Sequence, residues 1–263
     1  MWLKKILYRC LPLKSYLRTI SQIYFWTYRI GILRNSPYYE NHYFARNFIK
    51  EGDAVLDIGA NLGYYTILFS NWVGKEGKVY AVEPVELYVQ VLQENLYQFS
   101  KYPENVVLFP FALGAEEKEI IMEVPVINGL LSQGRSHVAE ILQNEEKHCI
   151  TFRAKIQKPQ RLFKEIQRLD YIKIDTEGYE LIILKEMMDL IRTFKPILFI
   201  ESDKQNSPML FEMLASEGYS FFYLVKKKLF RVVSSIQMPL TGYEFYAVHT
   251  EKLFVVNKFI DLQ

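Results

Sequence analysis

Residues 54–66 constrain the fold of this 263-residue chain more than any other segment. They read Ala-Val-Leu-Asp-Ile-Gly-Ala-Asn-Leu-Gly-Tyr-Tyr-Thr, an apolar run that ends in Asp57 and continues with Gly59 and Gly63. Such a run predicts a buried strand, and the two glycines allow a tight turn and close approach of a ligand before a helix begins. The segment therefore predicts the first strand, turn and helix of a ligand-binding α/β sheet.

The rest of the chain alternates short apolar runs with helical stretches, which is typical of βαβ units around a parallel sheet. Strands are expected near residues 54–58, 78–82, 105–109, 170–175, 196–201, 219–225 and 244–249. Helices are expected near residues 63–73, 85–99, 179–192 and 207–217. The pattern predicts a Rossmann-like, doubly wound α/β fold with a mostly parallel, seven-stranded sheet. A long connection at 226–243 suggests that the last strand is antiparallel and closes one edge of the sheet.

The chain divides into a helical extension at residues 1–42 and a main domain at residues 43–263. Within the main domain, the stretch at about 115–168 is too long for a simple crossover between strands. We expect an insertion there, with a hairpin around Glu119–Pro125 and a further strand near Cys149–Ala154.

The extension carries only basic charges before its first acid, Glu40. Its apolar residues recur with helical spacing on both sides of Pro12, which predicts two short basic amphipathic helices. No uncharged apolar run in it is long enough for a signal segment or a bilayer span. Three roles remain open for this extension: packing against the main domain, weak contact with a membrane surface, or a lid over the site.

Charge and cysteine content narrow the range of partners and compartments. The 32 Lys and Arg residues nearly balance the 30 Asp and Glu residues, and no motif that reads DNA or RNA is present. Nucleic acid is therefore not an expected partner. Cys10 and Cys149 cannot form a disulfide framework and have no metal-ligand spacing, so a reducing, cytoplasmic location is expected.

Asp57 also discriminates between two classes of cofactor. It stands where a G-x-G-x-x-G dinucleotide fingerprint has its first glycine. A carboxylate repels a diphosphate but attracts the cationic methionyl part of S-adenosylmethionine, so this turn favours the second cofactor. Glu83-Pro84 follows the second strand, where an acid in a Rossmann-type sheet accepts hydrogen bonds from both ribose hydroxyls.

Acids also stand at the ends of two later predicted strands. Asp175, followed by Glu177, ends the strand near 170–175, and Glu201 ends the strand near 196–201. In doubly wound sheets these strands lie beside the first, so the carboxylates are expected around one cleft with Asp57. Clustered acids raise one another's pKa, which makes them candidates for a general base or a cation site. The alternative is that Asp175 and Glu177 cap the next helix, with Lys173 as their counter-ion.

Five short blocks occur along the chain in a fixed order: LDIGANLGYYT at 56–66, VEP at 82–84, ALG at 112–114, IKIDTEG at 172–178, and KPILFIE at 195–201. Together they resemble the FkbM family of methyltransferases, from about Tyr43 to Val256. The resemblance implies a class I methyltransferase fold that uses S-adenosylmethionine to methylate hydroxyls of sugars, glycans or secondary metabolites. The residues that match the cofactor-binding motifs are Asp57, Gly59, Asn61, Gly63, Tyr64, Glu83, Pro84, Ala112 and Leu113. One departure is Phe163 after Leu162, where the family carries Leu-Asp.

Methyl transfer to a hydroxyl needs a base, because a hydroxyl is a poor nucleophile. We assign Asp175 as the base, with Glu177 and Glu201 as orienting groups or substitutes. Of the four histidines, His137 is the best alternative base because it lies in the insertion, which is expected to overhang the cleft. A magnesium ion shared by Asp175 and Glu201 is a variant, although the spacing shows no metal-ligand pattern and no metal is expected.

Two other classes of protein remain as alternatives. A nicotinamide-dependent oxidoreductase would share the sheet and Glu83, but it needs the glycine that Asp57 replaces. A non-catalytic binding or scaffold protein would keep the fold, and the cofactor, without turnover. The expected partner of the enzyme is a small-molecule or glycan hydroxyl acceptor, and the oligomeric state is left open.

Overall fold

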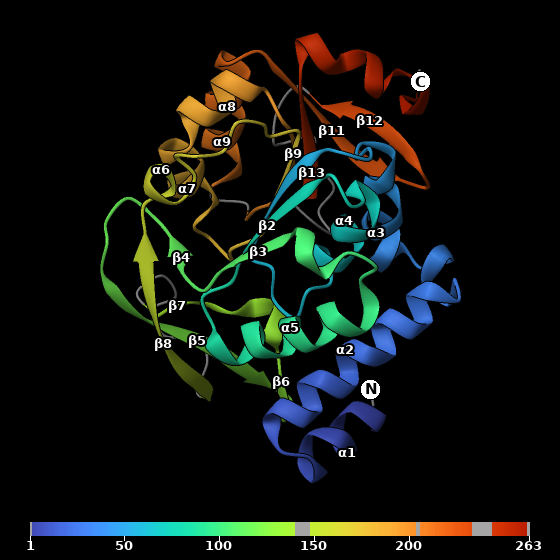
Figure 1. Cartoon of the computed structure of the whole chain (residues 1–263), viewed down its shortest axis with the longest axis vertical. Helices are drawn as coiled ribbons and strands as arrows, with labels where there is room; N and C mark the ends of the chain where they lie inside the picture. Colours follow the sequence, from blue (N-terminus) through green and yellow to red (C-terminus); the bar gives the residue numbers. More distant parts are fainter. Residues whose placement is uncertain (1, 140–147, 204–205, 233–243, 262–263) are drawn as a thin grey trace.

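The main sheet of the chain has eight strands (Figure 1). The structure is a computed structural model, and it describes residues 2–139, 148–203, 206–232 and 244–261. In spatial order the strands are β12 (Lys228–Val232), β11 (Tyr219–Val225), β13 (Glu244–His249), β10 (Ile197–Glu201), β9 (Tyr171–Ile174), β1 (Ala54–Ile58), β2 (Lys78–Val82) and β3 (Val106–Phe109). The five strands from β10 to β3 pair in parallel, and the other three pairings are antiparallel. All seven strands expected from the sequence are present.

Two expectations about the edge of the sheet were wrong. The sheet has an eighth strand, β12, and the antiparallel β13 lies between β10 and β11 instead of at the edge. The strand β12 follows β11 through a tight turn in which Lys226 and Lys227 both have positive φ. Turns of this kind usually carry Asn-Gly, and two lysines give no such signal, so the hairpin was missed. Residues 233–243 of the predicted connection lie outside the described residues.

Helices cover both faces of the main sheet. On one face, α7 (Glu180–Glu186), α8 (Met188–Phe194) and α9 (Ser207–Ser216) bury apolar side chains of β1, β9 and β10. On the other face lie α3 (Glu40–Phe44), α4 (Thr66–Val73) and α5 (Glu86–Phe99). The helix expected at 179–192 is divided at Met187, which is buried between α7 and α8.

Short segments complete the described structure. They are α6 (Pro159–Leu162) and the 3-10 turns η1 (Ile32–Asn35), η2 (Pro37–Tyr39), η3 (Ala45–Asn47), η4 (Pro103–Asn105), η5 (Gln133–Arg135), η7 (Thr250–Val255) and η8 (Asn257–Phe259).

The amino-terminal extension packs along the main domain. It forms α1 (Trp2–Cys10) and α2 (Leu13–Arg29), which meet at Pro12 as expected, and α2 lies beside α5 (Figure 1). The apolar face of α2 is buried, with Leu17 and Tyr24 almost fully enclosed. A buried hydrogen bond of 2.8 Å from Asn95 Nδ2 to Ser21 Oγ ties the two helices together. The apolar face of α2 is therefore occupied by the protein itself.

The insertion forms a second, smaller sheet. Its strands are β4 (Ala112–Leu113), β5 (Glu119–Ile127), β6 (Leu130–Leu131), β7 (His137–Val138) and β8 (Cys149–Gln157). The expected hairpin around 119–125 was misplaced, because β5 runs straight through it and turns at Asn128-Gly129, where both residues have positive φ. The segment from β6 to β7 extends over the carboxyl ends of β1 and β9, so that it contributes to the site.

None of the helices within the described ranges combines the length and the apolar character that crossing a membrane requires.

Candidate functional site

The turn after β1 brings two strands into close contact. Gly59 has a φ of 79°, and a Cβ added to it would lie 1.8 Å from the backbone oxygen of Asp175. Only glycine fits there, so the carboxyl ends of β1 and β9 meet at this point. Asn61, two residues further on, also has a positive φ. Its side-chain Nδ2 donates a hydrogen bond of 2.8 Å to the backbone oxygen of Gln133 in the insertion. The turn thus joins the main sheet to the overhanging insertion.

Glu83 is held in one orientation at the carboxyl end of β2. Its two oxygens accept hydrogen bonds from the backbone N–H groups of Asn61, at 2.8 Å, and Val85, at 2.9 Å. Burial raises the pKa of Glu83 to about 7, although both hydrogen bonds favour its charged form. Each carboxylate oxygen keeps a lone pair for a further donor, which is the capacity that binding of a ribose diol requires.

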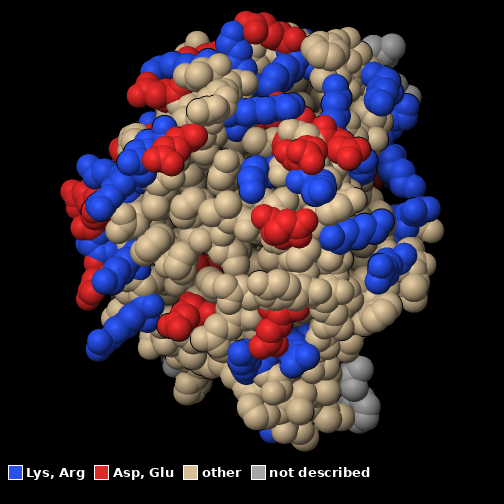
Figure 2. All heavy atoms as spheres, in the orientation of Figure 1, with Lys and Arg blue, Asp and Glu red and all other residues tan. Residues whose placement is uncertain are grey.

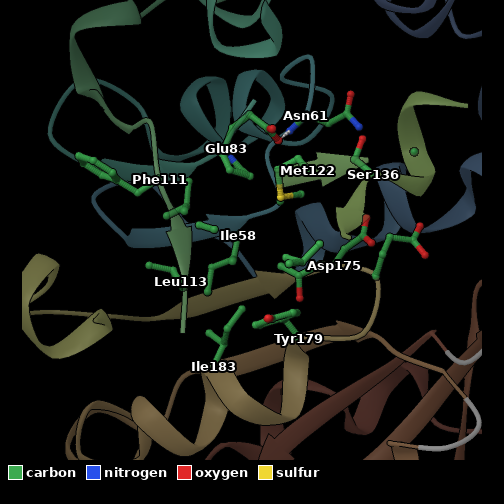
Figure 3. Close-up of a pocket in the computed structure, with 18 of the residues that line it drawn as sticks. Ile58, Asn61, Glu83, Phe111, Leu113, Met122, Ser136, Asp175, Tyr179 and Ile183 are labelled. Atoms are coloured by element: carbon green, nitrogen blue, oxygen red, sulfur yellow. Dashed lines mark hydrogen bonds between the residues drawn. The ribbon is translucent and has the colours of Figure 1, made fainter. Parts of the chain in front are cut away.

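Glu83 borders the first of two adjoining hollows. Figure 3 shows residues that line this first hollow. The wall beside Glu83 is mostly apolar and comes from the main sheet and the insertion together: Ile58, Phe111, Leu113, Met122, Val138 and Ile183. An apolar slot with one fixed carboxylate at its edge suits a flat heterocycle joined to a sugar. Of the residues predicted to bind the cofactor, this hollow is lined by Gly59, Asn61, Glu83, Pro84, Ala112 and Leu113.

The second hollow opens on the other side of the same turn. It shares Gly59, Asn61 and Asp175 with the first, so the two hollows adjoin at this turn and are described together as the cleft. Among the residues that complete its lining are the predicted Asp57, Tyr64 and Glu201, together with Tyr38, Asn41, His42, Tyr65, Lys173 and Glu244. Gly63 lines neither hollow; its φ of 90° serves the turn into α4.

Lys173 is a buried cation between two acids. Its Nζ lies 3.0 Å from Asp175 Oδ2 and 3.9 Å from Asp57 Oδ1, and it donates to the backbone oxygen of Gly59 at 3.1 Å. Burial opposes its charge, but Asp175 and Asp57 outweigh burial and raise the pKa of Lys173. The lysine stays protonated, so it stabilises the negative charge of both acids.

Asp57 is fully buried and only half satisfied. Its Oδ2 accepts a hydrogen bond of 2.5 Å from Thr66 Oγ1 at the start of α4, whereas Oδ1 has no hydrogen-bond partner among the described residues. Burial raises the pKa of Asp57 in spite of Lys173. A buried, unpaired carboxylate oxygen is costly, and a cationic ligand in the second hollow would relieve that cost.

The three acids predicted to be catalytic occupy different places in the cleft. Asp175 lies in both hollows, Glu177 lines the first, and Glu201 lines the second. Burial, with Asp175 nearby, raises the pKa of Glu177 to about 7, and burial together with Asp175 and Glu244 raises the pKa of Glu201 to about 9. At neutral pH Glu201 is therefore protonated and can donate a hydrogen bond.

Helix capping by Asp175 and Glu177, the alternative interpretation, was wrong. The backbone N–H groups of Thr176 and Gly178 donate instead to Glu180, whose Oε1 lies 2.8 Å and 3.2 Å from them. Asp175 and Glu177 are left facing the cleft. Lys173 does act as the counter-ion of Asp175, as that interpretation supposed.

His137 does not reach the cleft, contrary to expectation. The side chain is buried, with Nδ1 3.1 Å from the backbone oxygen of Arg135 and Nε2 3.6 Å from Glu123. The neighbouring Ser136 and Val138 line the first hollow instead, because side chains alternate along the strand. His148 and His249 line neither hollow.

His42 is the histidine that the structure places in the site. Its ring stacks on Tyr65 at 4.2 Å, and its Nδ1 lies 2.5 Å from the hydroxyl of Tyr24 on α2. Burial, with Lys173 nearby, lowers the pKa of His42 to about 3, so the imidazole is neutral. Sequence reasoning included His42 among the possible alternative bases but ranked it below His137, because no motif surrounds it.

The comparisons with known proteins agree with this geometry. A family model described as the methyltransferase FkbM domain matches residues 57–221. The chain belongs to this family. Methyltransferases of this family use S-adenosylmethionine as the methyl donor, and it is the cofactor of this FkbM-domain protein.

A solved structure of an FkbM methyltransferase has the same fold. An FkbM methyltransferase from Methylobacillus flagellatus KT is 16% identical with a TM-score of 0.50, over 75% of this chain and 43% of that one. The chain thus spans less than half the length of that relative. An S-adenosylmethionine-dependent O-methyltransferase from Thermotoga maritima is 13% identical with a TM-score of 0.42, over 81% and 65% of the two chains. No curated protein gives a match.

The cleft of this FkbM-domain protein fits S-adenosylmethionine. The first hollow offers an apolar slot and Glu83 for the nucleoside. Asp57, whose Oδ1 accepts no hydrogen bond from a described residue, belongs to the lining of the second hollow, where a cationic methionyl group would extend. Within the described ranges, no three His, Cys, Asp or Glu side chains are arranged to hold a metal ion.

Proposed function

We propose that this protein transfers a methyl group from S-adenosylmethionine to a hydroxyl of a sugar, glycan or similar small molecule, with Asp175 as the general base. The observation that carries the proposal is that two adjoining hollows share Asp175 in their linings. The first hollow suits the nucleoside of the cofactor, and the second would receive the methionyl group with the acceptor beside it. Asp175 stands where the two ligands would meet.

The second hollow has the chemistry that a polyhydroxy acceptor requires. Tyr38, Tyr64 and Tyr65 supply aromatic surfaces on which the C–H faces of a sugar can pack. Glu244 and the protonated Glu201 offer hydrogen bonds to hydroxyl groups. Asn41 keeps Glu244 in place through a bond of 2.6 Å from its Nδ2.

The geometry also assigns roles in the chemical step. When bound, S-adenosylmethionine supplies an electrophilic methyl group, so the protein has mainly to position the acceptor oxygen and remove its proton. Lys173 binds Oδ2 of Asp175, whereas Oδ1 makes no hydrogen bond with a described residue and is free to accept that proton. The neutral His42 is placed to orient the acceptor from the opposite wall.

The test compares three carboxylate variants of the full chain. With S-adenosylmethionine and a panel of simple glycosides, release of S-adenosylhomocysteine should fall by about 10²- to 10⁴-fold in Asp175→Asn, with cofactor affinity little changed. Glu201→Gln keeps the hydrogen-bond donor and should retain most activity. Asp189→Asn, an exposed acid on α8, is the matched control and should behave as the wild type.

Three outcomes would contradict the proposal. Near-normal turnover in Asp175→Asn with loss in Glu201→Gln would move the base to β10. Loss of cofactor binding in Asp175→Asn would place that acid on the cofactor side of the cleft. A wild-type protein that binds S-adenosylmethionine in calorimetry but turns over no acceptor would favour a non-catalytic role.

A further inference from the structure

A basic groove lies away from the cleft, between the end of α2, the η1 turn and the outer side of α4. It has a volume of about 640 Å³ and shares no lining residue with either hollow of the site. Five cations line it and no acid does, among the described residues: Arg29, Arg34, Arg46, Lys101 and Lys227. Figure 2 shows basic side chains gathered along the corresponding right-hand edge of the molecule.

The cations of the basic groove have no ion-pair partners among the described residues, although Arg46 Nη1 donates a hydrogen bond to the backbone oxygen of Ile49. All five are exposed, and none forms an ion pair with another described residue. Arg34 is held 5.9 Å from the ring of Tyr43, which stacks on Tyr28 at 4.2 Å in the wall of the groove. Cations gathered over an aromatic wall without counter-ions create a positive potential that attracts phosphate groups.

An apolar rim borders the basic groove. The rim consists of Trp26, Ile30 and Ile32, which are 50%, 67% and 66% exposed, at the end of α2 and the start of η1. It is continuous with the groove, because Arg29 lies 5.9 Å from the ring of Trp26 and Gly31, between the two isoleucines, lines the groove. Large apolar side chains exposed together beside cations mark an interaction surface.

We propose that the basic groove and the apolar rim form a docking surface for an anionic lipid bilayer, with a lipid phosphate in the groove and the rim in the headgroup region. The charge selects an anionic partner, and the isoleucines favour lipid over nucleic acid, because bases stack on aromatic rings but gain little from exposed aliphatic groups. Tryptophan favours the membrane interface. This surface differs from the apolar face of α2, which is buried against the protein.

The test is sedimentation of the full chain with vesicles of phosphatidylcholine alone or mixed with phosphatidylglycerol. The wild type should sediment with the anionic vesicles at low salt and should remain in the supernatant when only neutral vesicles are present. The groove variant Arg29→Gln/Arg34→Gln/Lys101→Gln should bind about 100-fold more weakly, since each cation near the surface contributes about fivefold. The rim variant Trp26→Ser/Ile30→Ser/Ile32→Ser should lose the part of the binding that persists at high salt.

The matched control carries three other charge changes, Lys155→Gln/Lys164→Gln/Lys185→Gln, on β8, before β9 and on α7, across the molecule from the groove (Figure 1). It should bind as the wild type. Melting temperature and S-adenosylmethionine affinity should be unchanged in all variants, so this test is independent of methyl transfer. The proposal would be overturned if the wild type did not bind anionic vesicles at low salt, or if the control and groove variants lost binding equally. It would also be overturned if a single-stranded oligonucleotide displaced the protein from vesicles while the rim variant bound vesicles as tightly as the wild type.

Discussion

Glu83 shows how one side chain can hold two turns of the fold and also border the first hollow of the candidate site. Its hydrogen bonds to Asn61 N and Val85 N fix the turns after β1 and β2, so its oxygens stand at the edge of the first hollow without further adjustment. Such preorganisation lowers the entropy that binding costs. Asp57 is a contrasting case, since its Oδ1 has Lys173 Nζ at 3.9 Å but accepts no hydrogen bond from a described residue.

Replacement of Glu83 by alanine should therefore weaken cofactor binding. Loss of a charged acceptor contributes about 1.5–3 kcal/mol, which corresponds to a roughly 10- to 150-fold lower affinity for S-adenosylmethionine in calorimetry. Glu86→Ala, at an exposed position in the first turn of α5, is the control and should keep wild-type affinity. Unchanged affinity in a folded Glu83→Ala protein would remove Glu83 from the site.

At the scale of elements, α2 is part of the core of the main domain. Its buried side chains contact α5 and the insertion, and the Tyr24 hydroxyl reaches His42 in the acceptor side of the cleft. The helix therefore connects the extension to the site. A segment outside the five motif blocks thus shapes a wall of the second hollow, where the proposed acceptor would lie.

Leu17→Ala should accordingly destabilise the whole protein. The side chain is fully buried on α2, and truncation of a buried leucine costs about 2–5 kcal/mol through lost burial and the cavity left behind. Ile23→Ala, at an exposed position of the same helix, should change the free energy of unfolding by only about 0.5 kcal/mol. Denaturant unfolding measures both, and equal small effects would show that α2 is not part of the cooperative unit.

For the molecule as a whole, the acids of the cleft make stability depend on pH. Burial holds the pKa of Glu201 at about 9, above its usual 4.5, so between these values the folded protein binds a proton that the unfolded chain releases. The free energy of unfolding therefore falls as the pH rises through this window. His42 acts in the opposite direction, because folding lowers its pKa from the usual 6.5 to about 3. Its contribution to the free energy of unfolding therefore rises with pH, but only below about pH 6.5.

The contribution of Glu201 to the pH dependence of stability is therefore best measured between about pH 7 and pH 9, above the range in which His42 contributes. Thermal unfolding of the wild type should show stability decreasing across that window, and Glu201→Gln should flatten the decrease because the variant cannot titrate there. Glu212→Gln, at an exposed glutamate on α9, should leave the slope unchanged. An equal slope in Glu201→Gln and the wild type would show that Glu201 is ionised in the folded protein.

The sequence alone determined the elements whose signals are local. Apolar runs and turn residues predicted all seven of the expected strands, and the acid and glycines after β1 predicted the turn that borders both hollows. The acids at the ends of β1, β9 and β10 were placed around one cleft because strand order in a doubly wound sheet follows general rules of connection.

Only the tertiary structure decided the features that depend on contacts between distant segments. The register of the insertion turned His137 away from the cleft, and the packing of α2 brought His42 into it. The burial that protonates Glu201 comes from neighbours on several elements, including Asp175 and Glu244. No local pattern carries such information, because burial and electrostatic potential depend on which surfaces meet after the chain has folded.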